Sequence, residues 1–303
     1  MRERITIERE LERLNRITPS RSQQYSREWE VKPGGEKVSD SFDVPYRWVC
    51  RLKVQEKGAS GWKDKEPATG ILIGPRHVLT AAHLLDPYYK QRAGQWRVLV
   101  YPGFDGSRHL GEEISTRIKV SKGWEAGTKE AGDLGAHDFG MVFLPGDIST
   151  KERKELGGKP LGYWGNPTSG HKTVFAPLDA PSLESKTALS AGYPRGQKKI
   201  LWVGTGMLSN VLIRIKDKIE RYKRGMDHNA MESLGEEARG MSGGPVWLKR
   251  GSTRYLIGIN SSITPVEHVD EKSGTRRKFW RGHAARVTLE LFEEVIDWMQ
   301  AEP

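Results

Sequence analysis

Cysteine is nearly absent from this sequence of 303 residues, and Cys50 is its single representative. One thiol cannot form an intrachain disulfide, and no cysteine-rich spacing of the kind that binds zinc is present. The sequence therefore suits a reducing compartment, and we assign it no metal site and no cofactor.

Long apolar runs are also missing. No window approaches the roughly 18 uninterrupted apolar residues of a membrane-spanning helix. The first residues, MRERITIERELERLNRI, are charged where a secretory signal would carry an apolar core. These two absences predict a soluble cytoplasmic protein that does not act in a membrane.

Positive charge is in excess, with 49 Lys and Arg residues against 39 Asp and Glu and a formal net charge of +10. Basic runs such as RIKDKIERYKR and TRRKFWR favour contact with polyanions. No zinc-finger spacing, aromatic RNA-binding signature or phosphate-binding loop accompanies them. Binding to nucleic acid is therefore a minor hypothesis. Most of these basic runs are expected to lie on the solvated surface.

Residues 1–37 are interpreted as an N-terminal extension. Apolar residues recur at i, i+4 and i+7 over residues 5–17, with charges between them, which predicts a short amphipathic helix. Residues 18–37 are rich in Ser, Pro, Gly and charge, as linkers are. The extension is a candidate propeptide or regulatory segment, and a regulatory protein partner is a further hypothesis.

From Val38 onward, short apolar runs alternate with Gly, Pro and polar turns, among them RWVCRLKV, WRVLVYPG, HDFGMVFLP and YLIGINSSI. This β-branched and aromatic content is typical of an all-β barrel or sandwich. Residues 106–132 and 214–235 are interpreted as long loops around a cleft. Near the end, LELFEEVIDWM spaces four residues for one face of a closing helix: Leu289, Phe292, Ile296 and Met299.

Three short stretches carry the groups of a nucleophilic hydrolase. A serine hydroxyl needs a base to take its proton and a carboxylate to orient that base. VLTAAHLL places His83 after an apolar strand, HDFGMVFL places Asp138 at the start of a buried run, and RGMSGGPVW places Ser242 among glycines. The backbone amides of Gly240 and Ser242 would stabilise an oxyanion.

Each of these motifs also has an ordinary structural interpretation. A histidine after a strand is often a structural residue, and a Gly-x-Ser-Gly-Gly stretch can be a tight turn. Asp133, in the glycine-rich stretch EAGDLGAH, is a second candidate for the acid. HDFG also matches the metal-binding tripeptide of protein kinases, but the chain lacks their glycine-rich loop and H-R-D element.

The order His, Asp, Ser along the chain resembles that of the chymotrypsin-like serine peptidases, through TAAH, HDFG and GMSGGPV. Within them the chain is most similar to the bacterial glutamyl-endopeptidase, or V8-like, branch, through KVSDSFDVPYRWVCRL and SAGYPRGQKKILWVGTGML. The resemblance covers about residue 38 to the end. It implies an all-β fold of two six-stranded antiparallel β-barrels, over residues 38–165 and 166–303, with the C-terminal helix following the second.

The resemblance also implies a role for each matching residue. His83 would act as general base and then general acid, Asp138 would hold its tautomer, and Ser242 would form the acyl-enzyme. Part of the stretch GINSS would pair with the backbone of an extended protein or peptide substrate: Asn260, Ser261 and Ser262. The expected function is a serine endopeptidase. The alternatives are a catalytically inactive binding module and a basic protein associated with nucleic acid.

At the positions expected to determine substrate specificity, the sequence departs from the glutamyl-endopeptidase branch. Glutamate-specific members resemble one another in binding the substrate carboxylate with a threonine five residues before the serine and a histidine on the following strand. The matching positions in this chain are Glu237 and Asn260, and neither favours a bound anion. Glu236 falls where trypsin places the acid of its pocket, and Gly282 matches a small residue that leaves such a pocket open. These residues predict cleavage after Arg or Lys.

Met241 precedes the serine, at the position where trypsin has an aspartate that pairs with a newly formed N-terminus. An uncharged thioether cannot make that ion pair. The sequence therefore predicts that activity does not depend on trypsin's activation switch.

Overall fold

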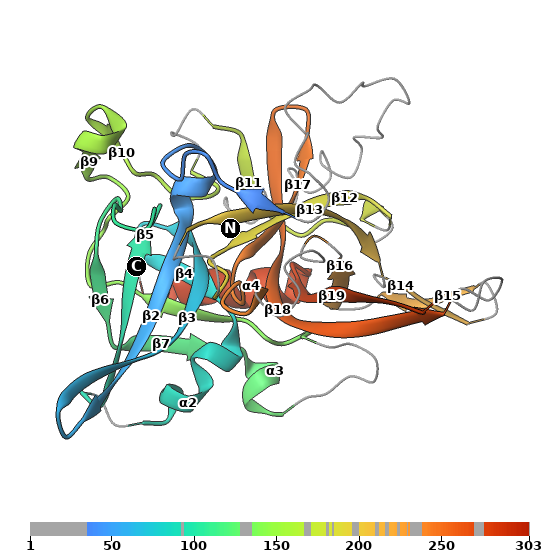
Figure 1. The fold of residues 1–303 in the computed structure, drawn as a ribbon, viewed down its shortest axis with the longest axis horizontal. Coiled ribbons are helices and arrows are strands. Elements are labelled where there is room, and N and C mark those ends of the chain that lie inside the picture. Colours follow the sequence, from blue (N-terminus) through green and yellow to red (C-terminus); the bar gives the residue numbers. More distant parts are fainter. Residues whose placement is uncertain are drawn as a thin grey trace.

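The computed structural model describes residues 35–91, 94–127, 135–166, 171–179, 182–183, 185–195, 200–209, 212–215, 218–222, 225–228, 230, 238–269 and 276–302. Within them the strands form two barrels that lie side by side (Figure 1). The expected all-β fold is therefore confirmed. The expected N-terminal helix lies outside the described residues, as do Asp133, Glu236 and Glu237.

The first barrel is an antiparallel sheet with the strand order β6-β5-β2-β3-β4-β8-β7. Its strands are β2 (Val49–Gly58), β3 (Gly61–Gly74), β4 (His77–Thr80), β5 (Trp96–Pro102), β6 (Glu113–Ser115), β7 (Arg117–Val120) and β8 (Gly140–Phe143). Only Thr116 separates β6 from β7, so the two form one interrupted segment. The barrel thus consists of six chain segments and is nearly closed.

The second barrel is a closed ring of six strands, because β13 pairs with β16 as well as with β12. The ring contains β12 (Thr187–Gly192), β13 (Trp202–Ser209), β16 (Gly225–His228), β17 (Pro245–Arg250), β18 (Thr253–Val269) and β19 (Arg276–Arg286). Strand β11 (Thr173–Phe175) adds to β18 in parallel. Every pair within the ring is antiparallel, as expected.

The end of the expected linker is part of this second barrel. Strand β1 (Glu36–Lys37) pairs with β13, with Glu36 opposite Val203. Gly35 precedes β1 at φ +89°, a conformation that glycine adopts without strain. The backbone pairing therefore extends the folded unit to residues that the composition alone had placed in the linker.

Three fully buried tryptophans connect the two barrels. Trp48 lies just before β2, Trp164 lies in the segment that joins the barrels, and Trp247 lies in β17. The ring centroids of Trp48 and Trp164 are 6.2 Å apart, and those of Trp164 and Trp247 are 6.0 Å apart, both in edge-to-face geometry. Such pairs favour a fixed relative orientation. The largest buried cluster therefore runs from the first barrel across the interface into the second and holds the barrels together, while the second barrel has a further cluster of its own.

Helix α4 (Leu289–Ala301) packs on both barrels, through Trp298 on Phe139 of the first and Phe292 on Phe175 of the second. Its N-cap is Thr288, whose hydroxyl accepts a hydrogen bond from the amide of Leu291. Its buried face consists of Leu291, Phe292, Val295 and Trp298. The expected position of Leu289 on this face is wrong, because its side chain is 51% exposed and the stripe beginning at Leu291 faces the core instead.

The two segments expected as long loops contain regular structure. Residues 106–132 include β6, β7 and the short helix α3 (Lys122–Glu125), and residues 214–235 include β15 (Lys218–Tyr222) and β16. These strands are short and rich in charged residues, so they lack the apolar runs by which strands such as β5 and β8 were recognised. The remaining short elements are η2 (Tyr46–Trp48), η3 (Ala82–Leu84), α2 (Asp86–Tyr89), β9 (Glu152–Arg153), η4 (Lys154–Leu156), β10 (Lys159–Pro160) and β14 (Leu212–Ile215).

Candidate active site

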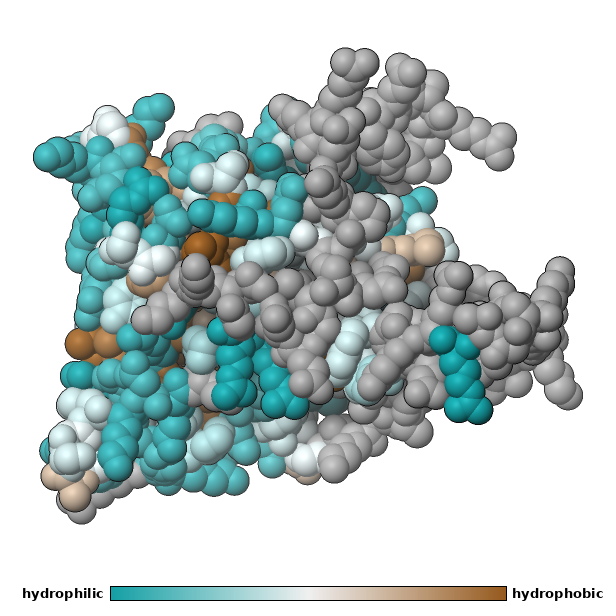
Figure 2. All heavy atoms as spheres, in the orientation of Figure 1, coloured by the Kyte–Doolittle hydropathy of each residue, from teal (hydrophilic) through white to brown (hydrophobic). Residues whose placement is uncertain are grey.

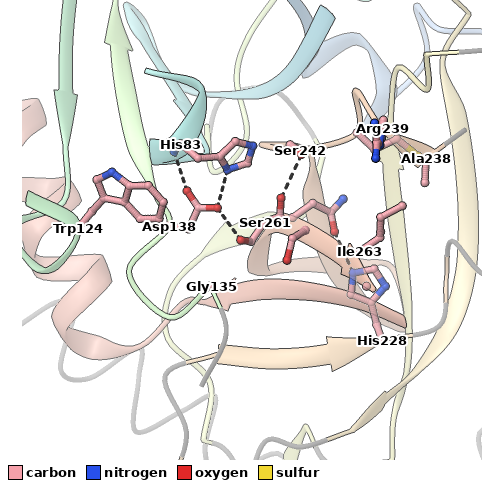
Figure 3. Close-up of a pocket in the computed structure, with 14 residues that line it drawn as sticks. His83, Trp124, Gly135, Asp138, His228, Ala238, Arg239, Ser242, Ser261 and Ile263 are labelled. Carbon is pink, nitrogen blue, oxygen red and sulfur yellow. Dashed lines mark hydrogen bonds and ion pairs between the residues drawn. The ribbon is translucent and has the colours of Figure 1, made fainter. Parts of the chain in front are cut away.

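A pocket of about 450 Å³ is lined by residues from both barrels. Figure 3 shows it with His83 and Asp138 at one end and His228 at the other. Its lining is His83, Trp124, Gly135, Asp138, His228, Ala238, Arg239, Met241, Ser242, Asn260, Ser261, Ser262, Ile263 and Gly282. The pocket therefore brings together all the described residues for which the sequence predicted a catalytic role, except Gly240.

His83 and Asp138 meet because of the pairing of two neighbouring strands. His83 lies in η3 just after β4, Asp138 lies just before β8, and the two strands pair with Thr80 opposite Gly140. One carboxylate oxygen of Asp138 is 2.7 Å from Nδ1 of His83, and the other accepts the backbone N–H of His83 at 2.8 Å. Because a carboxylate only accepts, Nδ1 carries the proton and Nε2 presents a lone pair when the imidazole is neutral.

A second-barrel side chain also contacts Asp138. The hydroxyl of Ser261 donates to Oδ2 of Asp138 at 2.5 Å, and the aspartate side chain is only 3% exposed. A buried carboxylate requires such donors, because burial without them costs several kcal/mol. The sequence had assigned Ser261 to substrate pairing, and the structure adds this contact across the interface between the barrels.

Ser242 lies in a turn that backbone hydrogen bonds fix against both barrels. Its carbonyl accepts the N–H of Thr69 in β3 at 3.0 Å, and the N–H of Gly243 donates to the carbonyl of Asn260 in β18 at 2.7 Å. The hydroxyl of Ser242 donates to the carbonyl of Ser261 at 3.0 Å. Among the described residues, the side chains of Ser242 and His83 are not joined by a hydrogen bond. Figure 3 shows the imidazole of His83 between Asp138 and Ser242.

The backbone at Gly240 can be formed only by glycine. Its φ is +98°, and a Cβ atom there would lie 2.5 Å from the carbonyl oxygen of Tyr193. The Thr69 hydroxyl donates to the carbonyl of Gly240 at 2.7 Å and so fixes this peptide. Within the described part of the chain, the N–H groups of Gly240 and Ser242 donate to no backbone carbonyl.

The expected substrate-binding residues divide into two groups. Asn260, Ser261, Ser262 and Gly282 all line the pocket. Glu236 and Glu237 lie outside the described residues, as does Asp133, the alternative acid.

Six pocket residues escaped the sequence analysis: Trp124, Gly135, His228, Ala238, Arg239 and Ile263. Trp124 and His228 show why. Trp124, in α3, lines the pocket near His83 and Asp138. His228, at the end of β16, is 1% exposed, and burial lowers its pKa to about 4. Both lie in segments interpreted as loops, and a single histidine or tryptophan in a loop carries no recognisable motif.

A second histidine network lies on the strands beside His228. Nδ1 of His283 is 2.7 Å from Oδ1 of Asp227, and its Nε2 is 2.8 Å from the hydroxyl of Thr264. These residues connect three neighbouring strands of the second barrel: β16, β19 and β18.

Two structural features are absent from the described residues. No cluster of three or more His, Cys, Asp or Glu side chains among them could hold a metal ion. No helix in the same part of the chain is both long and apolar enough to cross a membrane.

Comparison with known proteins places this geometry in a family. No curated protein sequence matches the chain. Among solved structures it is similar to a Glu endopeptidase in complex with MPD, with 18% sequence identity and a TM-score of 0.53, over 89% of this chain and 98% of that chain. At this level of sequence identity, the structural similarity shows a shared fold and nothing more.

The family model that matches is described as a trypsin-like peptidase domain and covers residues 68–259. That range runs from β3 into β18 and contains His83, Asp138 and Ser242. The chain therefore belongs to the trypsin-like peptidase family.

Proposed function

We propose that the protein is a serine endopeptidase in which Ser242, His83 and Asp138 form the catalytic triad. The observation that carries this proposal is the buried carboxylate of Asp138, which accepts both Nδ1 and the backbone N–H of His83 in the pocket that Ser242 also lines. This contact fixes the tautomer in which Nε2 can take a proton, as a general base requires.

The reaction follows from these roles. The oxygen of Ser242 attacks the peptide carbonyl while its proton passes to Nε2 of His83, and the amides of Gly240 and Ser242 stabilise the resulting oxyanion. The tetrahedral intermediate collapses, the C–N bond breaks, and His83 gives its proton to the leaving amine. Water then attacks the acyl-enzyme by the same route and releases the acid.

Substrate binding would complete the alignment of Ser242. In the free protein its hydroxyl donates to the carbonyl of Ser261, on the strand that we expect to pair with the substrate backbone. A substrate N–H that takes this carbonyl would release the hydroxyl, which could then donate to His83. Catalytic hydrogen bonds often tighten only once substrate is bound.

We expect the enzyme to cleave after Arg or Lys. This specificity rests on the sequence position of Glu236, where a carboxylate would attract a cation and repel an acidic side chain. A peptide library varied at the P1 residue, which precedes the cleaved bond, tests the expectation. Preference for P1 glutamate would contradict it, and so would an unchanged Arg preference after both Glu236→Gln and Glu237→Gln.

A binding module with the same fold is the second candidate function. It is favoured by the hydrogen bond of Ser242 to Ser261, which leaves the hydroxyl without a bond to His83 in the free protein. The presence of all three residues of the proposed triad argues against a binding module, since such a module needs neither a base nor a carboxylate to orient it.

Labelling with a fluorophosphonate probe distinguishes the two candidates, because the probe reacts with an activated serine. We expect wild type to be labelled and Ser242→Ala to be unlabelled. Ser252→Ala is the matched control, because Ser252 lies in an exposed turn between β17 and β18 and its loss should not affect labelling. A folded wild-type protein that takes up no label would support the binding module.

A further inference from the structure

The turn before Ser242 carries the amide of Gly240, one of the two oxyanion donors of the proposed mechanism. The N–H of Met241 donates to the carbonyl of Ala238 at 3.0 Å and closes this turn. Gly240 lies at its third position with φ +98°, as in a type II turn. Type I and type II turns differ in the orientation of the central peptide, which here joins Arg239 to Gly240. The direction of the Gly240 N–H therefore depends on what holds this peptide.

A backbone hydrogen bond holds the central peptide of the turn. The N–H of Arg195 donates to the carbonyl of Arg239 at 2.6 Å. The peptide bond between Arg239 and Gly240 is trans, so its carbonyl and its N–H point in opposite directions. The bond from Arg195 therefore sets the direction of the Gly240 N–H, and residues 193–195 support the turn.

One side chain of the first barrel contacts both the turn and its support. Thr69, in β3, is fully buried, and its hydroxyl donates to the carbonyl of Gly240 at 2.7 Å. The same oxygen accepts the N–H of Tyr193 at 3.0 Å. Thr69 thus holds the peptide that follows Gly240 directly, and it holds the preceding peptide through residues 193–195.

The position of the Thr69 hydroxyl is itself fixed. The backbone N–H of Thr69 donates to the carbonyl of Ser242 at 3.0 Å, and its carbonyl accepts the hydroxyl of Thr80 in β4 at 2.7 Å. A β-branched side chain is also restricted at χ1. The first barrel therefore offers the turn in the second barrel a contact with little freedom of its own.

We infer that Thr69 is a positioning residue, through which the first barrel holds the Gly240 amide where an oxyanion requires it. The inference rests on the proposed peptidase function and deepens it. Thr69 does not line the pocket, so it acts through Gly240 and not on the substrate. The oxyanion carries its charge in the transition state, so loss of Thr69 should affect kcat more than KM.

Thr69→Val tests the inference, because valine keeps the shape of threonine and replaces the hydroxyl by a methyl group. A methyl carbon needs about 3.5 Å from the Gly240 oxygen, whereas the hydroxyl lies at 2.7 Å, so the turn must move. We expect kcat to fall about 10- to 100-fold with KM little changed, because a misplaced donor costs less than a missing one. The test peptide carries the P1 residue that wild type cleaves best.

A spectroscopic measurement reports on the oxyanion itself. The probe is a peptidyl trifluoromethyl ketone whose carbonyl carbon is isotope-labelled for NMR. The oxygen of Ser242 bonds to that carbon, the carbonyl oxygen becomes the hemiketal oxyanion, and the serine proton passes to Nε2 of His83. Donors that stabilise the anion lower the pKa of the hemiketal. We expect this pKa to be about one to two pH units higher in Thr69→Val than in wild type, in line with the fall in kcat.

Two further variants are the controls. Thr69→Ser keeps the hydroxyl and should stay close to wild type in kcat and in hemiketal pKa. Thr173→Val removes another buried threonine hydroxyl, which accepts the N–H of Gly165 at 3.0 Å outside the pocket. It should lower the melting temperature but leave kcat and the hemiketal pKa unchanged. A merely structural role for Thr69 would make Thr69→Val behave like Thr173→Val.

Several outcomes would overturn the inference. They are a Thr69→Val protein with the kcat and hemiketal pKa of wild type, or a Thr69→Ser protein as impaired as Thr69→Val. If Thr69→Val does not fold, as judged by its melting curve, Thr69→Cys decides, because its thiol is a weaker donor and an unchanged hemiketal pKa would contradict the proposal. Absence of both cleavage and probe labelling in wild type would overturn the proposed function as well, whereas an active wild type with an unaffected Thr69→Val overturns only the role of Thr69.

Discussion

At the scale of single residues, the buried His228 lines the pocket and also makes the free energy of unfolding depend on pH. Burial lowers its pKa from 6.5 to about 4, the neighbouring His283 lowers it further, and the bond to Asn260 and the charge of Asp227 raise it in part. Between these two pH values the unfolded chain holds a proton that the folded chain does not. Acidification therefore favours unfolding over this range.

We expect this one group to reduce the free energy of unfolding by about 2 kcal/mol between pH 7 and pH 5. Its effect should be absent above about pH 7, where the imidazole is neutral in both states. Urea unfolding of wild type and His228→Asn at the two pH values measures the difference. His77, whose pKa is also lowered to about 4, acts in the same direction in both proteins and cancels in the comparison.

Equal pH dependence in wild type and His228→Asn would contradict this account. It would mean that the imidazole takes up its proton as readily in the folded protein as in the unfolded chain.

Single residues also show how much of the site the sequence could predict. His83, Asp138 and Ser242 were recognisable because each lies beside an apolar run in a distinctive local motif. His228 was not, since its place in the pocket depends on Asn260 and Gly282, which are distant in sequence. Contacts between distant strands have no signature in local sequence, so the end of the pocket could be identified only in three dimensions.

At the scale of elements, α4 connects the barrels. Trp298 packs against Phe139 of the first barrel, with ring centroids 5.9 Å apart, and Phe292 packs against Phe175 of the second at 5.2 Å. Phe139 directly follows Asp138 in the chain. The helix thus supports the segment that carries the proposed catalytic acid.

Thr288→Ala should lower the free energy of unfolding by about 1 kcal/mol, because it removes the side-chain cap of the first turn of α4. Urea unfolding followed by circular dichroism measures this change. Thr288→Ser is the matched control, because it keeps the capping hydroxyl and should remain close to wild type. A Thr288→Ala protein as stable as wild type would show that the cap contributes nothing.

The elements differ in how far sequence patterns predicted them. Strands β2, β5, β8 and β17 coincide with apolar runs and were expected, and helix α4 was expected from its periodicity. Strands β7 and β15 were missed because RIKV and KIERY carry many charges. Backbone pairing with a neighbouring strand forms these elements, and that pairing is not encoded in their own composition.

On the scale of the whole molecule, the described surface is mainly polar. Figure 2 shows a mostly hydrophilic face on which the apolar areas are small and separate. The large apolar side chains that are exposed among the described residues are Trp62, Ile114, Met207 and Leu289. Single exposed apolar residues of this kind are normal on soluble proteins.

The surroundings of Met241 explain why the N-terminus should not be needed for activity. Met241 is 2% exposed and clusters with Ala238, against which Trp202 and Ile263 pack. An α-amino group inserted here would lose its hydration and find no carboxylate at position 241. The surroundings of the residue before Ser242 are therefore maintained by apolar packing.

Deletion of residues 1–30 should leave activity unchanged or raise it. The cut retains β1, which pairs with β13, so the second barrel keeps all its described strands. The measurement is kcat/KM on one peptide for the full chain and the truncated chain. A strict requirement for a free α-amino group at one new N-terminus would contradict the prediction.

The most direct test of the triad is a double-mutant cycle on kcat/KM with Ser242→Ala and His83→Ala. Residues that act as one unit lose their function together, so each single variant should fall by about 10⁴-fold or more and the double variant should be nearly as active as the worse single one. Asp138→Asn should be similarly impaired, and Asp133→Asn, the control for the acid, should stay close to wild type. Losses that multiply independently in the double variant, or an inactive Asp133→Asn beside an active Asp138→Asn, would contradict the proposed triad.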